Sequence, residues 1–257
     1  MAAKAAVIIP ARYGSTRFPG KPLVILNSRP LIQWVYEGIN KSKSVSRVVI
    51  ATDDERIYSA VLGFGGDVVK TSSGLRTGSD RCAEVSKDFE EDVIVNLQAD
   101  EILKGPEMID ELVQIMSEDP SVLMGTLKKE IILPEELWDR NVVKVVSDKD
   151  DYAIYFSRSP IPYVRDRVFN NEERLPHKTF YKHLGIYAYR RDFLQLFSKL
   201  PASRLEDLEK LEQLRVLESG FKIKIKETGY ESYRIDTPED LINLEKVLCY
   251  DNRKEYT

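Results

Sequence analysis

The segment AAVIIPARYGSTRFPGKPL, residues 5–23, joins a short apolar run to a loop rich in glycine, proline and cations. Its first five residues are small or β-branched and too few for a helix, so they predict a buried strand. Similar runs follow at 47–51 (RVVIA) and 92–97 (DVIVNL). Stretches with helical spacing lie between these runs, at residues 31–41, 54–63 and 79–89. Short apolar strands that alternate with helices indicate βαβ units, and therefore an α/β fold with a parallel sheet.

The second half of the chain is less regular. It contains further predicted strands at 142–146, 152–156 and 185–189, and a polar loop at 165–182. Residues 205–218 have helical spacing and precede Gly220, a good C-cap residue, so they predict one continuous helix. Residues 222–226 alternate lysine with apolar side chains, a pattern typical of an edge strand. We find no linker and no repeat, which favours one compact unit.

Composition limits the classes of protein to which the chain can belong. The 257 residues are 42% hydrophobic and 31% charged, which argues against disorder. The net charge of −4 disfavours a general nucleic-acid binder, and no apolar run approaches the ~20 residues that cross a membrane. Two distant cysteines, Cys82 and Cys249, make a disulfide scaffold or a zinc site improbable and predict a cytoplasmic location.

The loop after the first strand has the chemistry of a phosphate site. Loops at the carboxyl ends of strands form the ligand sites of open α/β sheets. Here glycines permit close approach of backbone amides, hydroxyls add donors and three cations supply charge, namely Gly14 and Gly20, Ser15 and Thr16, and Arg12, Arg17 and Lys21. A triphosphate requires such neutralisation when pyrophosphate departs. A solvated basic turn is the alternative.

Two common nucleotide-binding loops are excluded. The chain has no G-x-G-x-x-G, the glycine pattern of dinucleotide-binding folds, in this loop. Gly20-Lys21 is followed by Pro22 where a Walker A loop needs Ser or Thr.

Further along the chain, several motifs occur in one characteristic order. They are PARYGSTRFPGKPL at 10–23, ATDDERI at 51–57, VNLQAD at 95–100, YFSRSPIP at 155–162, HLGIYAYR at 183–190, LEKLEQLRVLESG at 208–220 and IDTPEDL at 235–241. With these motifs the chain resembles, over nearly its whole length, the cytidylyltransferases that activate 3-deoxy-manno-octulosonate (Kdo), the CMP-Kdo synthetase family. The resemblance implies a nucleotide-diphospho-sugar transferase-like three-layer α/β/α sandwich with a mixed, mainly parallel sheet. It also implies a single domain over 1–257, a smaller sugar-binding and dimerisation lobe at about 130–200, and a homodimer.

The reaction implied by the resemblance is transfer of CMP from CTP to the anomeric hydroxyl of Kdo, with release of pyrophosphate, for lipopolysaccharide biosynthesis. Asp100 follows a predicted buried strand and Asp236 precedes the last helix, so the two carboxylates can meet beyond the edge of the sheet. The resemblance assigns both as ligands of Mg²⁺, a cation that prefers carboxylate and phosphate oxygens. A helix N-cap is the alternative role for Asp236.

The resemblance also implies the nucleotide site. The expected CTP-binding residues are Ala11, Arg12, Gly14, Ser15, Arg17, Lys21, Thr77, Gly78, Ser79, Gln98 and Asp100. Arg12, Lys21 and Asp100 are the expected catalytic residues. The segment 77–81 reads cytosine in the family, although a helix capped by Ser79 would explain the same residues.

The sugar acid is expected to contact Gln98, Arg158, His183, Tyr187, Glu212 and Gln213. His183, Tyr187 and Tyr189 share one face of a predicted strand because side chains alternate along a strand. Glu212 interrupts an apolar helical stripe, so it needs either a ligand or a partner such as Arg215.

The chain departs from the family at the Gln-Gly-Asp-Glu-Pro motif, which reads Gln98-Ala99-Asp100-Glu101-Ile102 here, and at Leu75-Arg76, where a histidine is usual. The segments GFGGDVV (63–69) and RLEDLEKLEQLR (204–215) resemble the branch that activates 8-amino-3,8-dideoxy-Kdo. The sugar therefore stays open between Kdo and its amino analogue. A nucleotidyltransferase for another sugar acid or a sugar phosphate, and a non-catalytic nucleotide-binding relative, are the alternatives.

Overall fold

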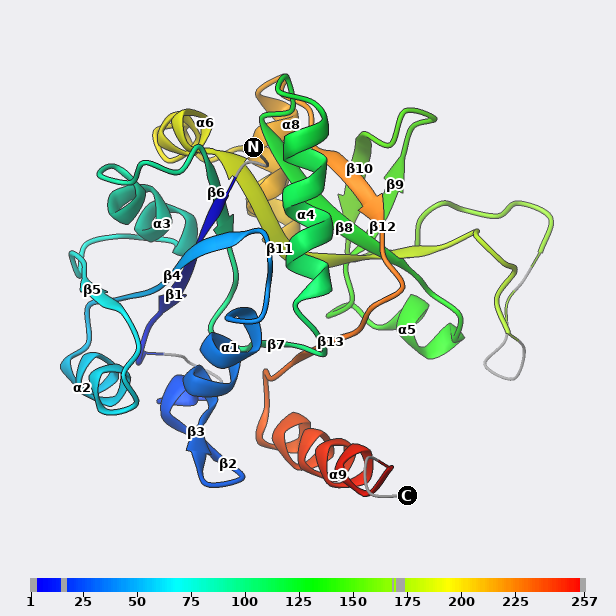
Figure 1. Ribbon diagram of the computed structural model, residues 1–257. Helices are drawn as coiled ribbons and strands as arrows, with labels where there is room; N and C mark the ends of the chain where they lie inside the picture. The colour runs from blue at the N-terminus through cyan, green and yellow to red at the C-terminus, as the bar shows by residue number, and fades with distance from the viewer. Residues whose placement is uncertain (1–3, 15–17, 168, 170–173, 255–257) are drawn as a thin grey trace.

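The structure is a computed structural model and describes residues 4–14, 18–167, 169 and 174–254. Within these residues a nine-stranded mixed sheet has the main order β10-β9-β11-β6-β1-β4-β5, with β8 beside β11 and β12 beside β8 (Figure 1). Its strands are β1 (Ala5–Ala11), β4 (Val45–Thr52), β5 (Val68–Lys70), β6 (Val93–Asn96), β8 (Met124–Glu130), β9 (Lys144–Ser147), β10 (Ala153–Ser157), β11 (Tyr181–Arg190) and β12 (Lys224–Glu227). Strands β6, β1, β4 and β5 are parallel, whereas β11 runs antiparallel to β6 and β8.

Two small ribbons complete the β-structure described. Strand β2 (Ile25–Leu26) pairs with β3 (Arg29–Pro30), and β7 (Glu101–Leu103) pairs with β13 (Ser232–Arg234). The helices are α1 (Leu31–Ile39), α2 (Glu55–Gly63), α3 (Gly78–Ser86), α4 (Glu107–Glu118), α5 (Pro134–Trp138), α6 (Arg191–Phe197), α7 (Arg204–Glu209), α8 (Gln213–Glu218) and α9 (Pro238–Lys254), with a 3-10 turn, η1, at Lys21–Leu23.

The helices cover both faces of the sheet, which confirms the three-layer α/β/α architecture. One apolar cluster packs α1, α2 and α4 against alternate residues such as Val7 and Val95. The other packs α3, α6 and α8 against their neighbours Ile8 and Ile94. Every residue of β1 and β6 is buried, as expected for strands with a helix layer on each side.

Most predicted elements of the first half are confirmed with small changes at their ends. The apolar runs lie in β1, β4 and β6, and the helical stretches form α1, α2 and α3. In the second half, β11 begins at Tyr181, so the last two residues of the predicted loop 165–182 belong to the sheet. Strand β12 pairs only with β8 among the described strands, as expected of an edge strand.

The predicted continuous helix at 205–218 is wrong. It is divided into α7 and α8, and Lys210 between them has the left-handed backbone with φ 54°. The cause is a tertiary contact. The Glu209 carboxylate accepts hydrogen bonds from Ser157 Oγ (2.6 Å) and the Arg158 amide (3.0 Å), while the Glu209 carbonyl accepts one from Arg158 Nε (2.7 Å). These bonds hold the end of α7 against the end of β10, so α8 starts in a new direction.

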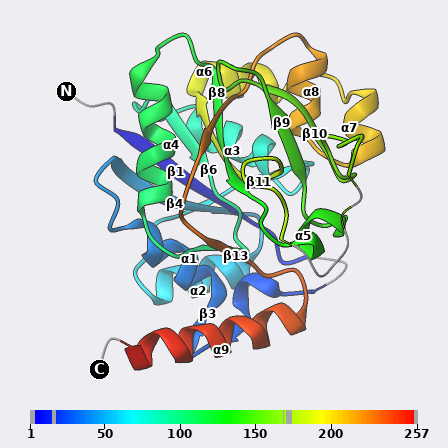
Figure 2. The same cartoon turned by 90° about the vertical axis from the view of Figure 1, so that its right-hand side faces the viewer.

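The smaller lobe expected at about 130–200 has one apolar cluster of its own, built from Ile131, Leu137, Leu175 and Phe180. The lobe is not separate, however, because β11 of the same range lies beside β6 in the main sheet. Figures 1 and 2 place α9 at the opposite end of the molecule from α6. No helix among the described residues is long and apolar enough to cross a membrane.

Candidate active site

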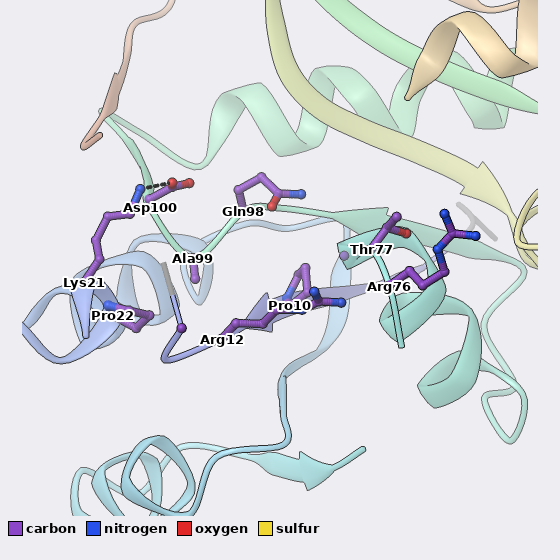
Figure 3. Close-up of a pocket in the computed structure, with 11 residues that line it drawn as sticks. Pro10, Arg12, Lys21, Pro22, Arg76, Thr77, Gln98, Ala99 and Asp100 are labelled. Carbon is purple, nitrogen blue, oxygen red and sulfur yellow. Dashed lines mark hydrogen bonds and ion pairs between the residues drawn. The ribbon is translucent and has the colours of Figure 1, made fainter. Parts of the chain in front are cut away.

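A cavity of about 250 Å³ opens at the carboxyl ends of β1 and β6 and at the start of α3. Figure 3 shows Lys21 and Asp100 at one end of this cavity, Arg76 and Thr77 at the other, and Arg12 and Gln98 between them. Its lining comprises Pro10, Arg12, Gly14, Lys21, Pro22, Arg76, Thr77, Gly78, Gln98, Ala99 and Asp100. Seven of the expected site residues lie in this lining, which brings together the glycine-containing loops at 10–22 and 76–78.

The loop after β1 is held closed by its own backbone. The Gly20 amide donates to the Tyr13 carbonyl (2.9 Å), and Gly20 has φ 71°. A side chain at this position would be strained by that φ and would also press on the Tyr13 ring, 3.1 Å from an added Cβ. Gly20 therefore turns the chain so that Lys21 begins η1 facing the cavity. Ser15 and Arg17 lie outside the described residues.

Lys21 joins the two carboxylates that the sequence singled out. Its ammonium donates to Asp100 Oδ2 (2.5 Å) and to Asp236 Oδ1 (3.3 Å). It also donates to the Ile235 carbonyl (2.7 Å), while the Ile235 amide donates to the Asp100 carbonyl (3.0 Å). Pairing of β7 with β13 aligns these segments. Asp100 and Asp236 thus converge, although 136 positions separate them in the sequence.

Asp236 does not cap the last helix. The Thr237 side chain accepts from the Asp240 amide (3.3 Å), and the Asp240 carboxylate accepts from the amides of Asp236 and Thr237 (both 2.8 Å). Because Thr237 and Asp240 satisfy the start of α9, the Asp236 carboxylate faces Lys21 and also pairs with Arg234 Nε (3.2 Å). No group of three or more metal-ligating side chains occurs in the part of the chain described. Two carboxylates suit Mg²⁺, which completes its shell with water and phosphate oxygens.

The segment 77–81 begins α3, but its cap is Thr77 and not Ser79. Thr77 Oγ1 accepts from the Asp80 amide (3.1 Å), and the Asp80 carboxylate accepts from the Thr77 amide (3.0 Å), a capping box. Gly78 approaches Pro10 so closely that an added Cβ would lie 3.1 Å from the proline ring. Ser79 is therefore available for another task, and its hydroxyl donates to Glu212 Oε2 (2.7 Å).

Two cations lie on the cavity wall besides Lys21. The Arg12 guanidinium donates to the Leu75 carbonyl, which fixes it between the two loops. Arg76, in the segment where the family usually has a histidine, is exposed and lines the same cavity. The cavity therefore carries local positive charge in an acidic protein.

Ala99, which stands where the family usually has glycine, fits its position without strain. It is buried, and it is not among the described residues with positive φ. Its neighbour Gln98 lies in the cavity and donates from Nε2 to Asn96 Oδ1 (3.1 Å).

The expected sugar-binding residues of β11 lie on one face, as predicted. The rings of His183 and Tyr187 are 5.2 Å apart, and those of Tyr187 and Tyr189 are 6.0 Å apart. His183 Nε2 lies 3.0 Å from Thr126 Oγ1. Burial, together with the positive charge of Arg234, lowers the pKa of His183 from 6.5 to about 3, so the imidazole is neutral at physiological pH.

Glu212 and Gln213 lie at the start of α8 with polar atoms still available. Glu212 Oε1 and Gln213 Nε2 are buried and have no hydrogen-bond partner among the described residues. Arg215 makes its close contacts with Glu206 (2.8 and 2.5 Å) and stays 3.8 Å from Glu212. Burial raises the pKa of Glu212, while the hydroxyl of Ser79 opposes that shift. A buried acceptor and a buried donor that make no hydrogen bond among the described residues are suited to binding a polyhydroxy ligand.

The family model for cytidylyltransferases matches residues 6–225, which is most of the chain. The chain belongs to the cytidylyltransferase family. The 3-deoxy-manno-octulosonate cytidylyltransferase of Geobacter sulfurreducens is 51% identical over 248 residues, covering 94% of this chain and 96% of that protein. The 8-amino-3,8-dideoxy-manno-octulosonate cytidylyltransferase of a Shewanella species is 47% identical, covering 95% and 98%. A solved structure of CMP:2-keto-3-deoxy-manno-octonic acid synthetase complexed with CTP matches with a TM-score of 0.87 and 41% identity, over 97% of this chain and 100% of that one. The expected resemblance and fold are confirmed.

Two arginines of this cytidylyltransferase, Arg158 and Arg234, make contacts that its motifs do not indicate. Arg158 donates from Nε to the carbonyl of Glu209 (2.7 Å), at the end of α7, and from a terminal nitrogen to the carbonyl of Arg140 (2.9 Å), just beyond α5. Arg234, which sequence reasoning missed, pairs with Asp236, and its charge acts on both His183 and Tyr187. The signal available was its place two residues before Asp236, in YRIDTPEDL.

Proposed function

We propose that this cytidylyltransferase transfers CMP from CTP to the anomeric hydroxyl of Kdo or of 8-amino-3,8-dideoxy-Kdo. The hydroxyl oxygen forms a bond to the α-phosphorus, the bond from that phosphorus to pyrophosphate breaks, and the hydroxyl proton is released. The observation that carries the proposal is the convergence of Lys21, Asp100 and Asp236 at one end of a cavity whose other walls are the two glycine-containing loops.

The nucleotide would lie along this cavity. Thr77 and Gly78, at the start of α3, are suited to the cytosine ring, because a small uncharged turn admits a pyrimidine more easily than a purine. Arg12 and Lys21 are suited to the phosphates, because cations fixed in place stabilise charge that develops on the departing pyrophosphate. The relative solved in complex with CTP supports this assignment.

Mg²⁺ is proposed as the cofactor, and Asp100 and Asp236 would hold it. Both carboxylates approach a single cation, Lys21, and both side chains are largely buried, at 17% and 20% exposed. When bound, Mg²⁺ supplies a Lewis acid that lowers the pKa of the attacking hydroxyl. Lys21 would keep the carboxylates oriented and carry part of the phosphate charge.

The sugar acid would lie between β11 and the start of α8. His183 and Tyr187 offer an aromatic face, and Glu212 and Gln213 offer an acceptor and a donor to sugar hydroxyls. The neutral imidazole of His183 is suited to hydrogen bonding and not to donating a proton during the reaction. Relatives named for Kdo and for its 8-amino analogue have similar identity to this chain, so both sugars belong in the test.

A pyrophosphate-release assay tests the proposal. We expect release with CTP but not with ATP, GTP or UTP, and only when Kdo or 8-amino-Kdo is present with Mg²⁺. The ratio of kcat/KM for the two sugars identifies the natural one. Asp100→Ala should lower the rate by at least about a thousandfold, whereas Asp88→Ala, an exposed aspartate just beyond α3, should leave it unchanged. Undiminished Mg²⁺-dependent activity of Asp100→Ala contradicts the assignment.

We further propose that the protein is a cytoplasmic homodimer. Support comes from the apolar surface at α5 of the smaller lobe, where Ile132, Leu133 and Trp138 are 47%, 52% and 52% exposed. Light scattering coupled to size exclusion should give twice the chain mass, and Trp138→Glu should shift the species towards the monomer.

A further inference from the structure

A chain of hydrogen bonds runs from the nucleotide cavity to the sugar side of the proposed site. Gln98 Nε2 donates to Asn96 Oδ1 (3.1 Å), and Asn96 Nδ2 donates to Ser79 Oγ (3.4 Å). Ser79 Oγ in turn donates to Glu212 Oε2 (2.7 Å). All three donors point the same way, from the amide in the cavity towards the carboxylate of Glu212, the residue that precedes α8.

Asn96 is the centre of this chain. It is the last residue of β6, 1% exposed, and the other residues of that strand are fully buried and apolar. Its partner across the sheet is Tyr187, so both side chains extend from the same face, the face that α3 covers. Ser79, at the start of α3, is 3% exposed.

An amide in such a place is costly unless its polar atoms are paired, and an apolar residue would suit the strand better. The two hydrogen bonds described for Asn96 lead in opposite directions, one to the expected nucleotide site and one to the expected sugar site. On one side, Asn96 engages Nε2 of Gln98 and so leaves Gln98 Oε1 as the end that can accept from a ligand. On the other side, through Ser79, the chain engages Oε2 of Glu212 and leaves Oε1, the buried atom that has no hydrogen-bond partner among the described residues.

We propose that Asn96 is a positioning residue that orients Gln98 for the nucleotide and, through Ser79, Glu212 for the sugar acid. This inference rests on the proposed function, because it assigns the two ends of the chain to the two substrates. Asn96 touches neither substrate. It acts by fixing which side-chain oxygen of Gln98 and of Glu212 is presented to the ligand. Without Asn96, both of these side chains can rotate.

A double-mutant cycle tests the proposal. Asn96→Leu keeps the side-chain volume and removes both hydrogen bonds, and Ser79→Ala removes only the arm to Glu212. We expect Asn96→Leu to raise KM for CTP several-fold and KM for the sugar acid about tenfold, and Ser79→Ala to raise mainly the latter. In the double variant, the KM for the sugar acid should exceed that of Ser79→Ala by less than about twofold.

Thermal unfolding of the same four proteins separates positioning from packing. If Asn96 had only a structural role, Asn96→Leu would lower the melting temperature and change the KM for CTP and the KM for the sugar acid in equal proportion. The KM of the double variant for the sugar acid would then equal the product of the two single effects. Either result, or KM values of Asn96→Leu within twofold of wild type, overturns the proposal.

If Asn96→Leu does not fold, Asn96→Asp takes its place, because it keeps the side-chain volume and the oxygen that accepts from Gln98. It should raise KM for the sugar acid alone, and an equal rise for CTP overturns the proposal. A wild-type protein that releases no pyrophosphate contradicts the proposed function instead.

Discussion

Lys21 is the residue on which the candidate site depends most directly. Its ammonium lies between the carboxylates of Asp100 and Asp236 and neutralises charges that would otherwise repel each other. We expect Lys21→Met to lower kcat/KM for CTP by about two to three orders of magnitude, because a fixed cation beside the phosphates is lost. Steady-state kinetics measure this, with Lys43→Met, an exposed lysine, as the matched control. Equal kinetics for the two variants would exclude Lys21 from phosphate binding.

His183 gives the protein a distinct sensitivity to acid. Its pKa is lowered to about 3 in the folded state, against 6.5 as the ordinary value. Below pH about 6.5 this histidine binds a proton in the unfolded chain but not in the folded protein. The free energy of unfolding therefore falls as pH falls towards 3, by about 1.4 kcal/mol per pH unit. We expect the free energy of unfolding of His183→Gln, measured with urea, to fall less steeply than that of the wild type between pH about 7 and about 5. Identical slopes for variant and wild type would show that His183 is protonated freely in the folded protein.

At the residue scale, the sequence predicts the site residues that belong to motifs. It does not predict those whose role depends on neighbours that are distant in the sequence. Asp100 follows a predicted strand and Asp236 precedes the last helix, so the sequence allows them to meet beyond the edge of the sheet, and their shared contact with Lys21 agrees with that. Arg234 and Asn96 were missed: the one signal for Arg234 is its place two residues before Asp236, and nothing in a strand asparagine indicates its neighbours. The capping roles of Ser79 and Asp236 were open alternatives, and Thr77 and Thr237 perform them instead.

At the scale of elements, the break between α7 and α8 is the feature that positions Glu212. The sequence pattern predicts one helix because helical propensity and spacing are local properties. The contacts of Glu209 with β10 are not local, and they override that preference. The short apolar strands were easier to predict, because burial on both faces selects β-branched residues along their whole length.

The break carries a conformational cost that a substitution can remove. Lys210 has φ 54° and ψ 46°, a left-handed conformation that costs a residue with a Cβ about 1–2 kcal/mol. Its ion pair with Asp207 is exposed at both side chains and contributes little. We expect Lys210→Gly to raise the free energy of unfolding by about 0.5–1 kcal/mol, measured with urea. Lys87→Gly is the matched control, because Lys87 is exposed and has φ −57°, and it should be neutral or destabilising. Destabilisation by Lys210→Gly would mean that the lysine side chain supports the break.

At the scale of the whole molecule, net charge and local charge have opposite signs. The chain carries −4, yet Arg12, Lys21 and Arg76 line one cavity. Attraction of a triphosphate to this cavity should weaken when salt screens it. We expect KM for CTP to rise several-fold between about 0.05 M and about 0.5 M KCl, and KM for the sugar acid, with its single carboxylate, to rise less. A KM for CTP that does not change with salt would argue against phosphate binding by these cations.

The sheet brings segments from both ends of the chain to one place: β1 and its loop, the end of β6, and β13 with Asp236. We propose that this assembly forms a phosphodiester between CMP and a sugar acid. ³¹P NMR of the purified protein with CTP, Mg²⁺ and either Kdo or 8-amino-Kdo tests it most directly. We expect CTP to be consumed while pyrophosphate and a new CMP phosphodiester appear in equal amounts. Unchanged CTP with both sugars, or free CMP without the phosphodiester, would contradict it.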